Sequence, residues 1–364
     1  LTALDGKRVA GSDRTLSPLT DKLETYGIGV FCGHDAKRID DFDAVVYTVA
    51  ITPDNGEYLR AKERGIPLIS RADYLGYIMT RRENRIGVSG MHGKSTCTSM
   101  FASVYMRARR DPTVLSGADY PPMGGYFRIG EGRDLIFEAC EYMDSFLDFS
   151  PTTAVILNVE LEHIDYFKNI DNIRKSYGRF AALTGERGRV IVNADDPDAC
   201  LSVSGFDGKK VTFGIENEAD YTAKNIVLGC GASEFDIMKG GALLCHAVMK
   251  VPGRHNICDA LAVAACADLD GIVAEDISAG LAYSVVKNAL FKVIKLTDAS
   301  MAESVANQIV SDDLFLTVCD AKDTPAASVQ YGAETVEKLL SLTNSIRLGV
   351  ARATPGILGV ALGT

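Results

Sequence analysis

The chain has 364 residues, of which 47% are hydrophobic and 24% are charged, as in an ordinary globular protein of two or three domains. The formal net charge is −10, and basic residues form only short pairs such as Arg109-Arg110. Nucleic acids and anionic membranes attract a concentrated positive field, so this charge pattern argues against both as partners. The sequence carries no signal for an oligomeric state.

Cysteine usage and the absence of long apolar runs point to a reducing compartment. The nine cysteines are scattered without a C-x-x-C pair, which predicts a cytoplasmic location. Cys32, Cys97, Cys140 and Cys266 are interpreted as small core residues. No stretch reaches the roughly 18 to 20 apolar residues that a membrane span needs. The amino terminus, "LTALDGKR", is neither a signal peptide nor a starting methionine, so we expect the chain to begin inside a larger gene product.

The first 80 residues alternate strand-like and helix-like runs. Residues 7–13 and 43–51 read as buried strands. Residues 17–27 and 56–65 have helical length: Pro18 lies near the start of the first segment, and Gly27 and Gly65 end the two segments. This βαβ pattern predicts a parallel sheet and a Rossmann-like domain over residues 1–82. The charged segment 80–85 is interpreted as a linker.

A second α/β unit begins with a strand at 85–89, followed by a glycine-rich turn and a helix at 95–110 that is expected to stop at Asp111-Pro112. The turn contains Gly93, Lys94 and Ser95, but Val88 stands where the common phosphate loop has its first glycine. A strand, a glycine-rich turn and a helix form the context of a phosphate cradle. We therefore interpret the turn as a shortened cradle, G-x-x-G-K-S; the alternative is a chance triplet in a loop.

Polar side chains follow three further strands of this unit, at 134–141, 153–163 and 189–198. Because the carboxyl ends of parallel strands share one sheet edge, where ligands of such sheets bind, we expect these side chains near the glycine-rich turn. Solvated loops are the alternative explanation. The residues are Glu138, Glu141, Asn158, Glu160, Glu162, His163, Asn193, Asp195 and Asp196.

Transfer of a phosphoryl group from ATP needs Mg²⁺ held by hard oxygen ligands. Ser95 offers a hydroxyl and Glu138 a carboxylate, while His163 could bind a second metal ion or a metal-bound water. His163 could equally be a hydrogen-bonded histidine at a helix start.

Beyond residue 216 the pattern changes. Residues 233–250 alternate around Gly240-Gly241, which predicts a hairpin, and 251–271 form an alanine-rich helix that stops at Gly271. Arg254, His255 and Asn256 stand at the helix start, where they could contact a base or ribose, or serve as caps and turn contacts.

Four segments occur here in the order, and at about the spacing, of the Mur ligase family: "GMHGKST" (90–96), the run 138–167 from "EACEYMD" to "HIDYF", "NADDPD" (193–198) and "VPGRHN" (251–256). The resemblance covers roughly residues 8 to 285 and is densest from 86 to 200. Residues 11–55 also resemble the family's uridine-nucleotide domain. The resemblance implies an α/β protein with a Rossmann-like domain at 1–82, a central P-loop parallel-sheet ATPase domain at 83–286 and a short α/β segment at 287–364.

Within the family, the resemblance is greatest to members that join L-alanine to the lactyl carboxylate of UDP-N-acetylmuramate in peptidoglycan synthesis. It implies ATP and Mg²⁺ as cofactors and catalysis by positioning and charge neutralisation. Lys94, Glu138 and His163 would be the catalytic residues, with Ser95, Glu138 and His163 as metal ligands. The nucleotide would contact Gly90, Met91, His92, Gly93, Lys94, Ser95, Thr96, His255, Asn256 and Asp259. The muramoyl substrate would contact His92, Glu141, Asp144, Ser145 and Asn158.

Three departures from the family pattern accompany the resemblance. The chain is expected to lack the first strand and glycine-rich loop of the uridine-nucleotide domain. Asp259 stands where the family usually has an asparagine, and the Asp-Asp-Tyr-Ala-His-His-Pro motif of the third domain is absent from 286–364. These departures leave open a nucleotide-binding relative that has lost ligation. A related murein-peptide or folylpolyglutamate ligase is a further alternative, but the run "EACEYMDSFL" argues against the folate enzyme.

Overall fold

A computed structural model describes residues 2–3, 6–48, 51–229, 232–283, 348–354 and 357–362. The chain divides into two compact units, residues 1–82 with 144–150, and residues 83–143 with 151–364. Both units are mixed α/β, which confirms the predicted fold class. Among the described residues, no helix is long and apolar enough to cross a membrane.

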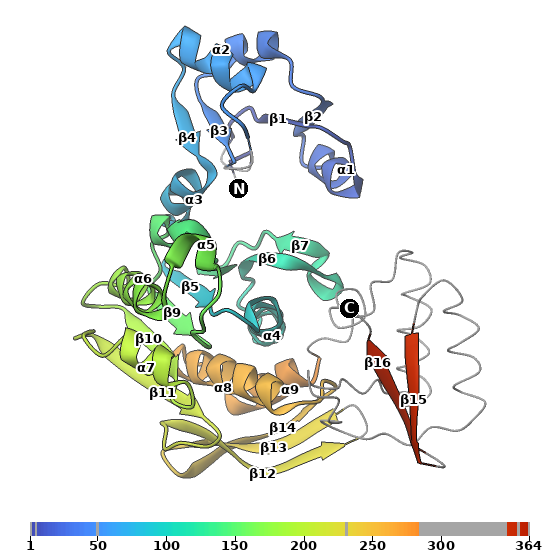
Figure 1. The fold of residues 1–364 in the computed structure, drawn as a ribbon, viewed down its shortest axis with the longest axis vertical. Helices are drawn as coiled ribbons and strands as arrows, with labels where there is room; N and C mark the ends of the chain where they lie inside the picture. The colour runs from blue at the N-terminus through green and yellow to red at the C-terminus, as the bar shows by residue number, and fades with distance from the viewer. Residues whose placement is uncertain are drawn as a thin grey trace. The chain divides into compact units, whose positions relative to one another are not determined.

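The N-terminal unit contains two parallel strand pairs, β1 with β2 and β3 with β4 (Figure 1). The elements in chain order are β1 (Ala10–Asp13), α1 (Pro18–Glu24), β2 (Gly29–Cys32), η1 (Ala36–Asp41), β3 (Val45–Tyr47), α2 (Gly56–Arg64), β4 (Leu68–Ser70) and α3 (Arg71–Met79). Local signals set the helix ends: Asn55 accepts hydrogen bonds from the Glu57 and Tyr58 amides, and Gly65 ends α2 with φ 67°. The expected βαβ pattern and parallel pairing are confirmed, but β1 and β3 are half-buried or exposed, so their interpretation as buried strands is wrong.

The central unit is built on a ten-stranded sheet in the order β14-β13-β12-β11-β10-β9-β5-β8-β6-β7. The strands are β5 (Asn84–Ser89), β6 (Thr113–Tyr120), β7 (Gly125–Arg128), β8 (Asp134–Glu138), β9 (Thr153–Ile156), β10 (Arg189–Asn193), β11 (Lys209–Gly214), β12 (Tyr221–Gly229), β13 (Ala232–Lys239) and β14 (Ala242–Met249). Strands β6, β8, β5, β9, β10, β11 and β12 pair in parallel, and β7, β13 and β14 pair antiparallel.

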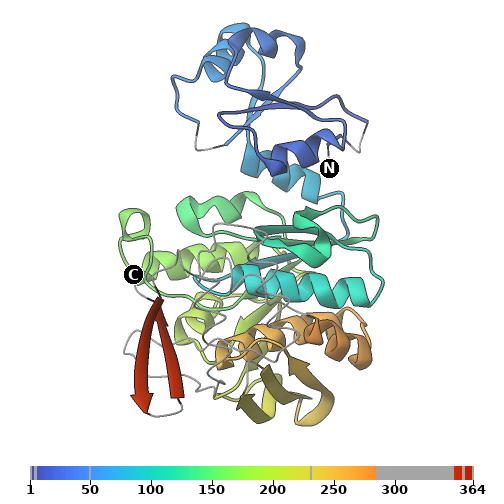
Figure 2. The same cartoon turned by 90° about the vertical axis from the view of Figure 1, so that its right-hand side faces the viewer.

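Helices cover both faces of this sheet (Figures 1 and 2). They are α4 (Lys94–Arg107), α5 (Ile164–Phe167), α6 (Ile170–Ala182), α7 (Pro197–Ser202), α8 (Arg254–Leu269) and α9 (Ala274–Ala282), with the 3-10 turns η2 (Pro121–Met123) and η3 (Tyr142–Asp148). Alternate residues of β5 show the two faces: Ile86 and Val88 belong to the core cluster that includes α4 and α8, whereas a Cβ on Gly87 would lie 3.0 Å from Phe180 of α6. Burial on both sides explains why the central strands read as continuous apolar runs.

A cluster of paired polar groups closes the amino ends of the central strands. Asp134 at the start of β8 is fully buried and receives a bidentate Arg110 guanidinium at 3.0 and 3.2 Å. Asp270, after α8, accepts from Tyr105 and Arg189 and from the Asn84 amide at 2.7 Å. Burial, followed by Cys266 and Asp270, raises the pKa of Tyr105, which keeps its hydroxyl a donor. Each charged group here has a partner of opposite charge.

Several sequence expectations differ from the structure. The segment 80–85 is a linker only to Glu83, because Asn84 and Arg85 already pair in β5. Helix α4 ends at Arg107 rather than at Asp111-Pro112, since the chain turns through Arg109 with φ 56°. Cys97 and Cys266 are buried as expected, but Cys32 and Cys140 are exposed, so their interpretation as core residues is wrong.

The C-terminal half of the central unit follows the predicted pattern. Strands β13 and β14 form the hairpin, and both turn glycines have positive φ, 54° at Gly240 and 85° at Gly241. Helix α8 ends just before Gly271, with φ 77°. Of the expected segment 287–364, only β15 (Leu348–Thr354) and β16 (Ile357–Leu362) are described, as an antiparallel pair; its other expected elements lie outside the described residues.

Candidate functional site

The glycine-rich turn runs from the end of β5 into α4, at the carboxyl edge of the sheet. Asn158, which follows β9, holds this turn: its Oδ1 accepts the His92 amide at 2.8 Å, and its Nδ2 donates to the His92 carbonyl at 3.1 Å. Met91 N–H also donates to the Asn158 carbonyl at 3.4 Å. The turn is therefore fixed to a neighbouring strand end before any ligand arrives.

Gly93 is the residue that directly precedes the amide end of α4. Its φ of 83° is in the left-handed region, and a Cβ there would lie 2.9 and 3.0 Å from the two carboxyl oxygens of Asp259. Only glycine fits this backbone. Lys94, Ser95 and Thr96 form the first turn of α4, whose amide end attracts anions. This strand, turn and helix match the local structure expected of a shortened phosphate cradle.

Lys94 and His163 are both paired with Glu141. Lys94 Nζ lies 3.1 Å from Glu141 Oε2, and His163 Nε2 lies 3.3 Å from Glu141 Oε1. The Glu141 side chain is only 2% exposed, against 16% for Lys94 and 35% for His163. A buried carboxylate thus joins the only lysine of the turn to a histidine some 70 positions away in the chain.

His163 is held in an uncommon backbone conformation for a residue with a side chain. Its φ is 49° and its ψ 47°, at the start of the short helix α5. The Tyr142 ring lies 4.7 Å from the His163 ring, and the Tyr142 hydroxyl donates to Asp165 at 3.1 Å. Strained backbone of this kind is often found where a side chain must be aimed.

Glu138, at the end of β8, is held by two residues of β6 that sequence reasoning missed. Its Oε1 accepts the Ser116 hydroxyl at 3.0 Å and the Gly117 amide at 2.6 Å. A Cβ on Gly117 would lie 2.7 Å from Glu138 Oε2, so the glycine allows this close approach. The only signal for it in the sequence is the Ser-Gly pair that follows the apolar start of β6.

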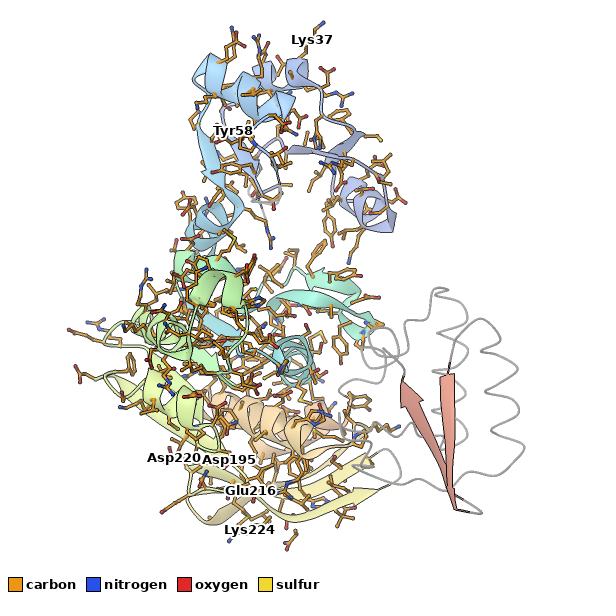
Figure 3. All side chains as sticks on the ribbon, viewed as in Figure 1. Lys37, Tyr58, Asp195, Glu216, Asp220 and Lys224 are labelled. Atoms are coloured by element: carbon orange, nitrogen blue, oxygen red, sulfur yellow. The ribbon has the colours of Figure 1, made fainter. Side chains whose placement is uncertain are left out.

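The polar residues after β10 are used for local structure. Asp195 accepts the amides of Ile215 and Asn217, the latter at 2.7 Å, and Asp196 caps α7 through the Ala199 amide at 2.8 Å. Figure 3 shows Asp195 and Glu216 at the same end of β10 and β11, and the Glu216 amide also donates to Asp195 at 3.0 Å. Asp196 Oδ2 also accepts the Val159 amide at 3.0 Å, next to Asn158, so Asp196 lies near the glycine-rich turn, but backbone amides occupy the oxygens of both aspartates.

The residues at the start of α8 divide between two roles. Asn256 is buried and donates to the Pro252 carbonyl at 2.6 Å, which is the turn contact weighed above as an alternative. Desolvation lowers the pKa of His255. Asp259, one turn further, is 5% exposed, and burial raises the pKa of its carboxyl well above the usual range. That carboxyl therefore favours its neutral form behind Gly93.

The N-terminal unit contains its own polar cluster, which sequence reasoning also missed. Ser12 Oγ lies 2.9 Å from His34 Nδ1 and donates to Glu57 Oε2 at 2.6 Å, and His34 lies 3.1 Å from the same oxygen. The triplets Gly-Ser-Asp, within β1, and Gly-His-Asp, directly after β2, were its only signal in the sequence. Asp144 and Ser145 lie on η3, in the segment 144–150 that belongs to this unit.

The arrangement in the central unit can hold a polyphosphate. The amide end of α4 and the ammonium of Lys94 supply positive charge in a turn that Asn158 fixes. The fit to a metal ion is looser: among the described residues, no three His, Cys, Asp or Glu side chains are close enough together to hold one. Mg²⁺ bound to phosphates needs only one or two protein carboxylates and completes its shell with water, which Glu138 can satisfy.

Comparison with known proteins was made against family models and individual relatives. Residues 1–83 match the model for the Mur ligase family, catalytic domain, and residues 88–267 match that for the Mur ligase middle domain. The UDP-N-acetylmuramate–L-alanine ligase of Caldanaerobacter subterraneus is 42% identical over 272 residues, 74% of this chain and 59% of that protein. That of Clostridium novyi is 43% identical over 71% of this chain and 56% of that protein. The chain thus spans less than two thirds of these relatives.

Solved structures show the same fold. A crystal structure of a UDP-N-acetylmuramate–alanine ligase from Thermotoga maritima is 28% identical, with a TM-score of 0.68 over 83% of this chain and 68% of that chain. The UDP-N-acetylmuramate:L-alanyl-γ-D-glutamyl-meso-diaminopimelate ligase from Neisseria meningitides is 24% identical with a TM-score of 0.69. It covers 79% of this chain and 93% of that chain, and it supports the fold alone.

Proposed function

The chain belongs to the Mur ligase family, and on that premise we propose that it acts in ATP-dependent ligation of L-alanine to the lactyl carboxylate of UDP-N-acetylmuramate. The observation that carries the proposal is the fixed glycine-rich turn with Lys94 at the carboxyl edge of a parallel sheet. The relatives at 42% and 43% identity bear this ligase name, which supplies the substrates. A cytoplasmic location is part of the proposal.

In the proposed reaction, a lactyl carboxylate oxygen takes the γ-phosphoryl group of ATP, which breaks the bond to ADP and forms an acyl phosphate. The amine of L-alanine then attacks the acyl carbon, loses a proton, and expels inorganic phosphate. Neither step needs a covalent bond to the protein, so the protein acts by positioning its substrates and neutralising their charge. Residues 90–96 would hold the phosphates, with Lys94 on the β- and γ-groups.

The proposed metal ligands are Ser95, Glu138 and His163. Mg²⁺, when bound, would neutralise charge on the phosphate oxygens. Glu138 is suited to this role because Ser116 and Gly117 fix its Oε1, which leaves acceptor capacity on the carboxylate. His163 is oriented by Glu141 and Tyr142.

The remaining residues are proposed to contact the organic parts of the substrates. His92, Glu141, Asp144, Ser145 and Asn158 are assigned to the muramoyl side. His255, Asn256 and Asp259 are assigned to the adenine side of the nucleotide. Asn158 would have two roles in this scheme: it would contact the muramoyl group, and its side-chain amide holds the turn through two hydrogen bonds to the His92 backbone.

Phosphate release from Mg-ATP tests the proposal. The chain is assayed alone, with UDP-N-acetylmuramate, with L-alanine, and with both. Release that requires both substrates is expected. If the chain binds ATP but releases no phosphate with both present, it is a nucleotide-binding relative without ligation. If another amino acid or peptide replaces L-alanine, it is a related ligase.

A further inference from the structure

Every N–H donor of the Lys94 ammonium has an acceptor within the protein. The ammonium donates to the carbonyl of Gly90, to that of Met91 at 3.3 Å, and to Glu141 at 3.1 Å. A lysine ammonium has three donors and no more. A phosphate oxygen can therefore reach Lys94 with a short hydrogen bond only if one of these partners gives up its place.

We infer that Glu141 is a built-in counter-ion that competes with phosphate for Lys94, so that nucleotide binding exchanges a buried carboxylate for a phosphate. The inference rests on the proposed binding of ATP at this turn. The Gly90 and Met91 carbonyls belong to the turn itself, which Asn158 and α4 hold in place. The Glu141 side chain is the partner that can yield.

Charge determines the direction of this exchange. Phosphate and carboxylate are both anions, and the Glu141 side chain is 2% exposed, so water and salt screen its charge little. The arriving phosphate must both take the Lys94 donor and approach a buried negative charge. His163, 3.3 Å from the other carboxylate oxygen of Glu141, is expected to remain its partner when Lys94 is released. The carboxylate thus lowers the affinity of the empty turn for any polyphosphate.

Substitution of Glu141 by glutamine separates this role from a structural one. Glutamine has nearly the same shape and can still accept from Lys94, but it carries no charge. If Glu141 competes with phosphate, Glu141→Gln binds nucleotide more tightly. If Glu141 only aims Lys94 at the phosphate, the same change leaves binding equal or weaker, because glutamine keeps the hydrogen bond and loses only the charge. The sign of the effect therefore decides between the two roles.

The test is calorimetric titration of the full chain with AMP-PNP, a non-hydrolysable ATP analogue. EDTA is present, so that no bound metal ion contributes to the measured affinity. Glu141→Gln is expected to bind about fivefold more tightly than the wild type, the difference between a charged and a neutral hydrogen-bond partner. Glu162→Gln is the matched control. Glu162 lies 3.6 Å from His92 of the same turn and is not among the described partners of the Lys94 ammonium, so its change is expected to alter affinity less than about twofold.

Failure of the inference is distinguishable from failure of the proposed function. If the wild type does not bind AMP-PNP, or Lys94→Ala binds it equally well, the proposed nucleotide site is wrong and the inference falls with it. If the wild type binds, Lys94→Ala does not, and Glu141→Gln binds equally or more weakly, the inference alone is overturned. Glu141→Asp provides a second variant: its shorter side chain weakens the Lys94 contact, and a smaller gain in affinity is expected.

Discussion

The two edges of the central sheet use charged side chains in opposite ways. At the amino edge, Asp134 and Asp270 are met by the guanidinium groups of Arg110 and Arg189, and the cluster is closed by neutral donors. At the carboxyl edge, Lys94 shares one buried carboxylate with a histidine, beside the amide end of α4, which attracts anions. The amino edge is complete without a ligand, and the carboxyl edge is arranged to exchange partners.

This difference explains why a polar residue at a strand end is not by itself evidence of a site. Asp195 lies at the carboxyl edge, yet backbone amides occupy its oxygens. Glu138 lies at the same edge and is held through one oxygen by a serine and a glycine. What distinguishes a binding site is the hydrogen-bonding capacity that its side chains keep after their hydrogen bonds within the folded protein are counted.

The largest expected effect is the loss of stability when the polar cluster at the amino edge is disrupted. Asp270→Ala removes the acceptor of Arg189, Tyr105 and Asn84, so it should lower the free energy of unfolding by about 3–5 kcal/mol, because charged and polar groups are left buried and unpaired. Urea unfolding measures this, and Arg60→Ala, in an exposed pair, should cost less than about 1 kcal/mol. The folded Asp270→Ala protein should bind AMP-PNP like the wild type. A large loss of affinity would contradict the view that the amino edge serves stability and not binding.

The corresponding change at the carboxyl edge is Lys94→Ala. Here we expect affinity to change more than stability: AMP-PNP binding should weaken by at least about 100-fold, because charge-assisted contacts to phosphate are lost. Calorimetry measures the affinity and thermal unfolding the stability. Unchanged affinity would refute the interpretation of the turn as a phosphate cradle.

Asp259 gives a pH-dependent test of the same edge. Burial raises the pKa of this carboxyl, so the folded protein holds the proton to higher pH than the unfolded chain does. Its contribution to stability therefore falls as pH rises from about 4, the unfolded value, to the folded pKa. Asp259→Asn removes the cost of burying an ionisable carboxyl group and should stabilise the protein at neutral pH by about 1–3 kcal/mol. The gain should shrink below about pH 4; a gain that is independent of pH would show that this proton plays no part.

The smallest expected effect concerns the bonds that fix the turn. Asn158→Ala removes two hydrogen bonds to His92. Because the turn is then less well fixed, AMP-PNP binding should weaken by about five- to tenfold, which corresponds to about 1 kcal/mol of binding free energy. Asn169→Ala, which removes the cap of α6, is the control: it should cost about 1 kcal/mol of stability and leave the affinity unchanged. Equal affinities for the two variants would show that the turn does not depend on Asn158.

Local sequence was sufficient to predict the elements around the turn. The apolar run of β5, the glycines at 90 and 93 and the helical length of α4 are all short-range signals, and the structure confirms these elements. The hairpin at Gly240-Gly241 was predictable for the same reason, since its turn needs two residues with positive φ. The assigned functions of the site residues remain predictions.

Long-range pairing could not be read from the sequence. The contact of Lys94 with Glu141 depends on how β5 and β8 align, and the amino-edge cluster joins Asn84 to Asp270, 186 positions apart. The sequence also does not tell which carboxylates the backbone will occupy: Asp195 and Glu138 both follow an apolar strand, but only the folded chain shows that three consecutive amides face Asp195. The exposure of Cys32 and Cys140 likewise follows from tertiary packing.

The most direct test of the central claim, that the carboxyl edge transfers a phosphoryl group to a carboxylate, is isotope transfer. UDP-N-acetylmuramate labelled with ¹⁸O in its lactyl carboxylate is incubated with the chain, Mg-ATP and L-alanine, and the released phosphate is analysed by mass spectrometry. The account predicts one ¹⁸O atom in each phosphate, because the acyl phosphate carries a carboxylate oxygen to phosphorus. Unlabelled phosphate, released by water alone, would contradict it.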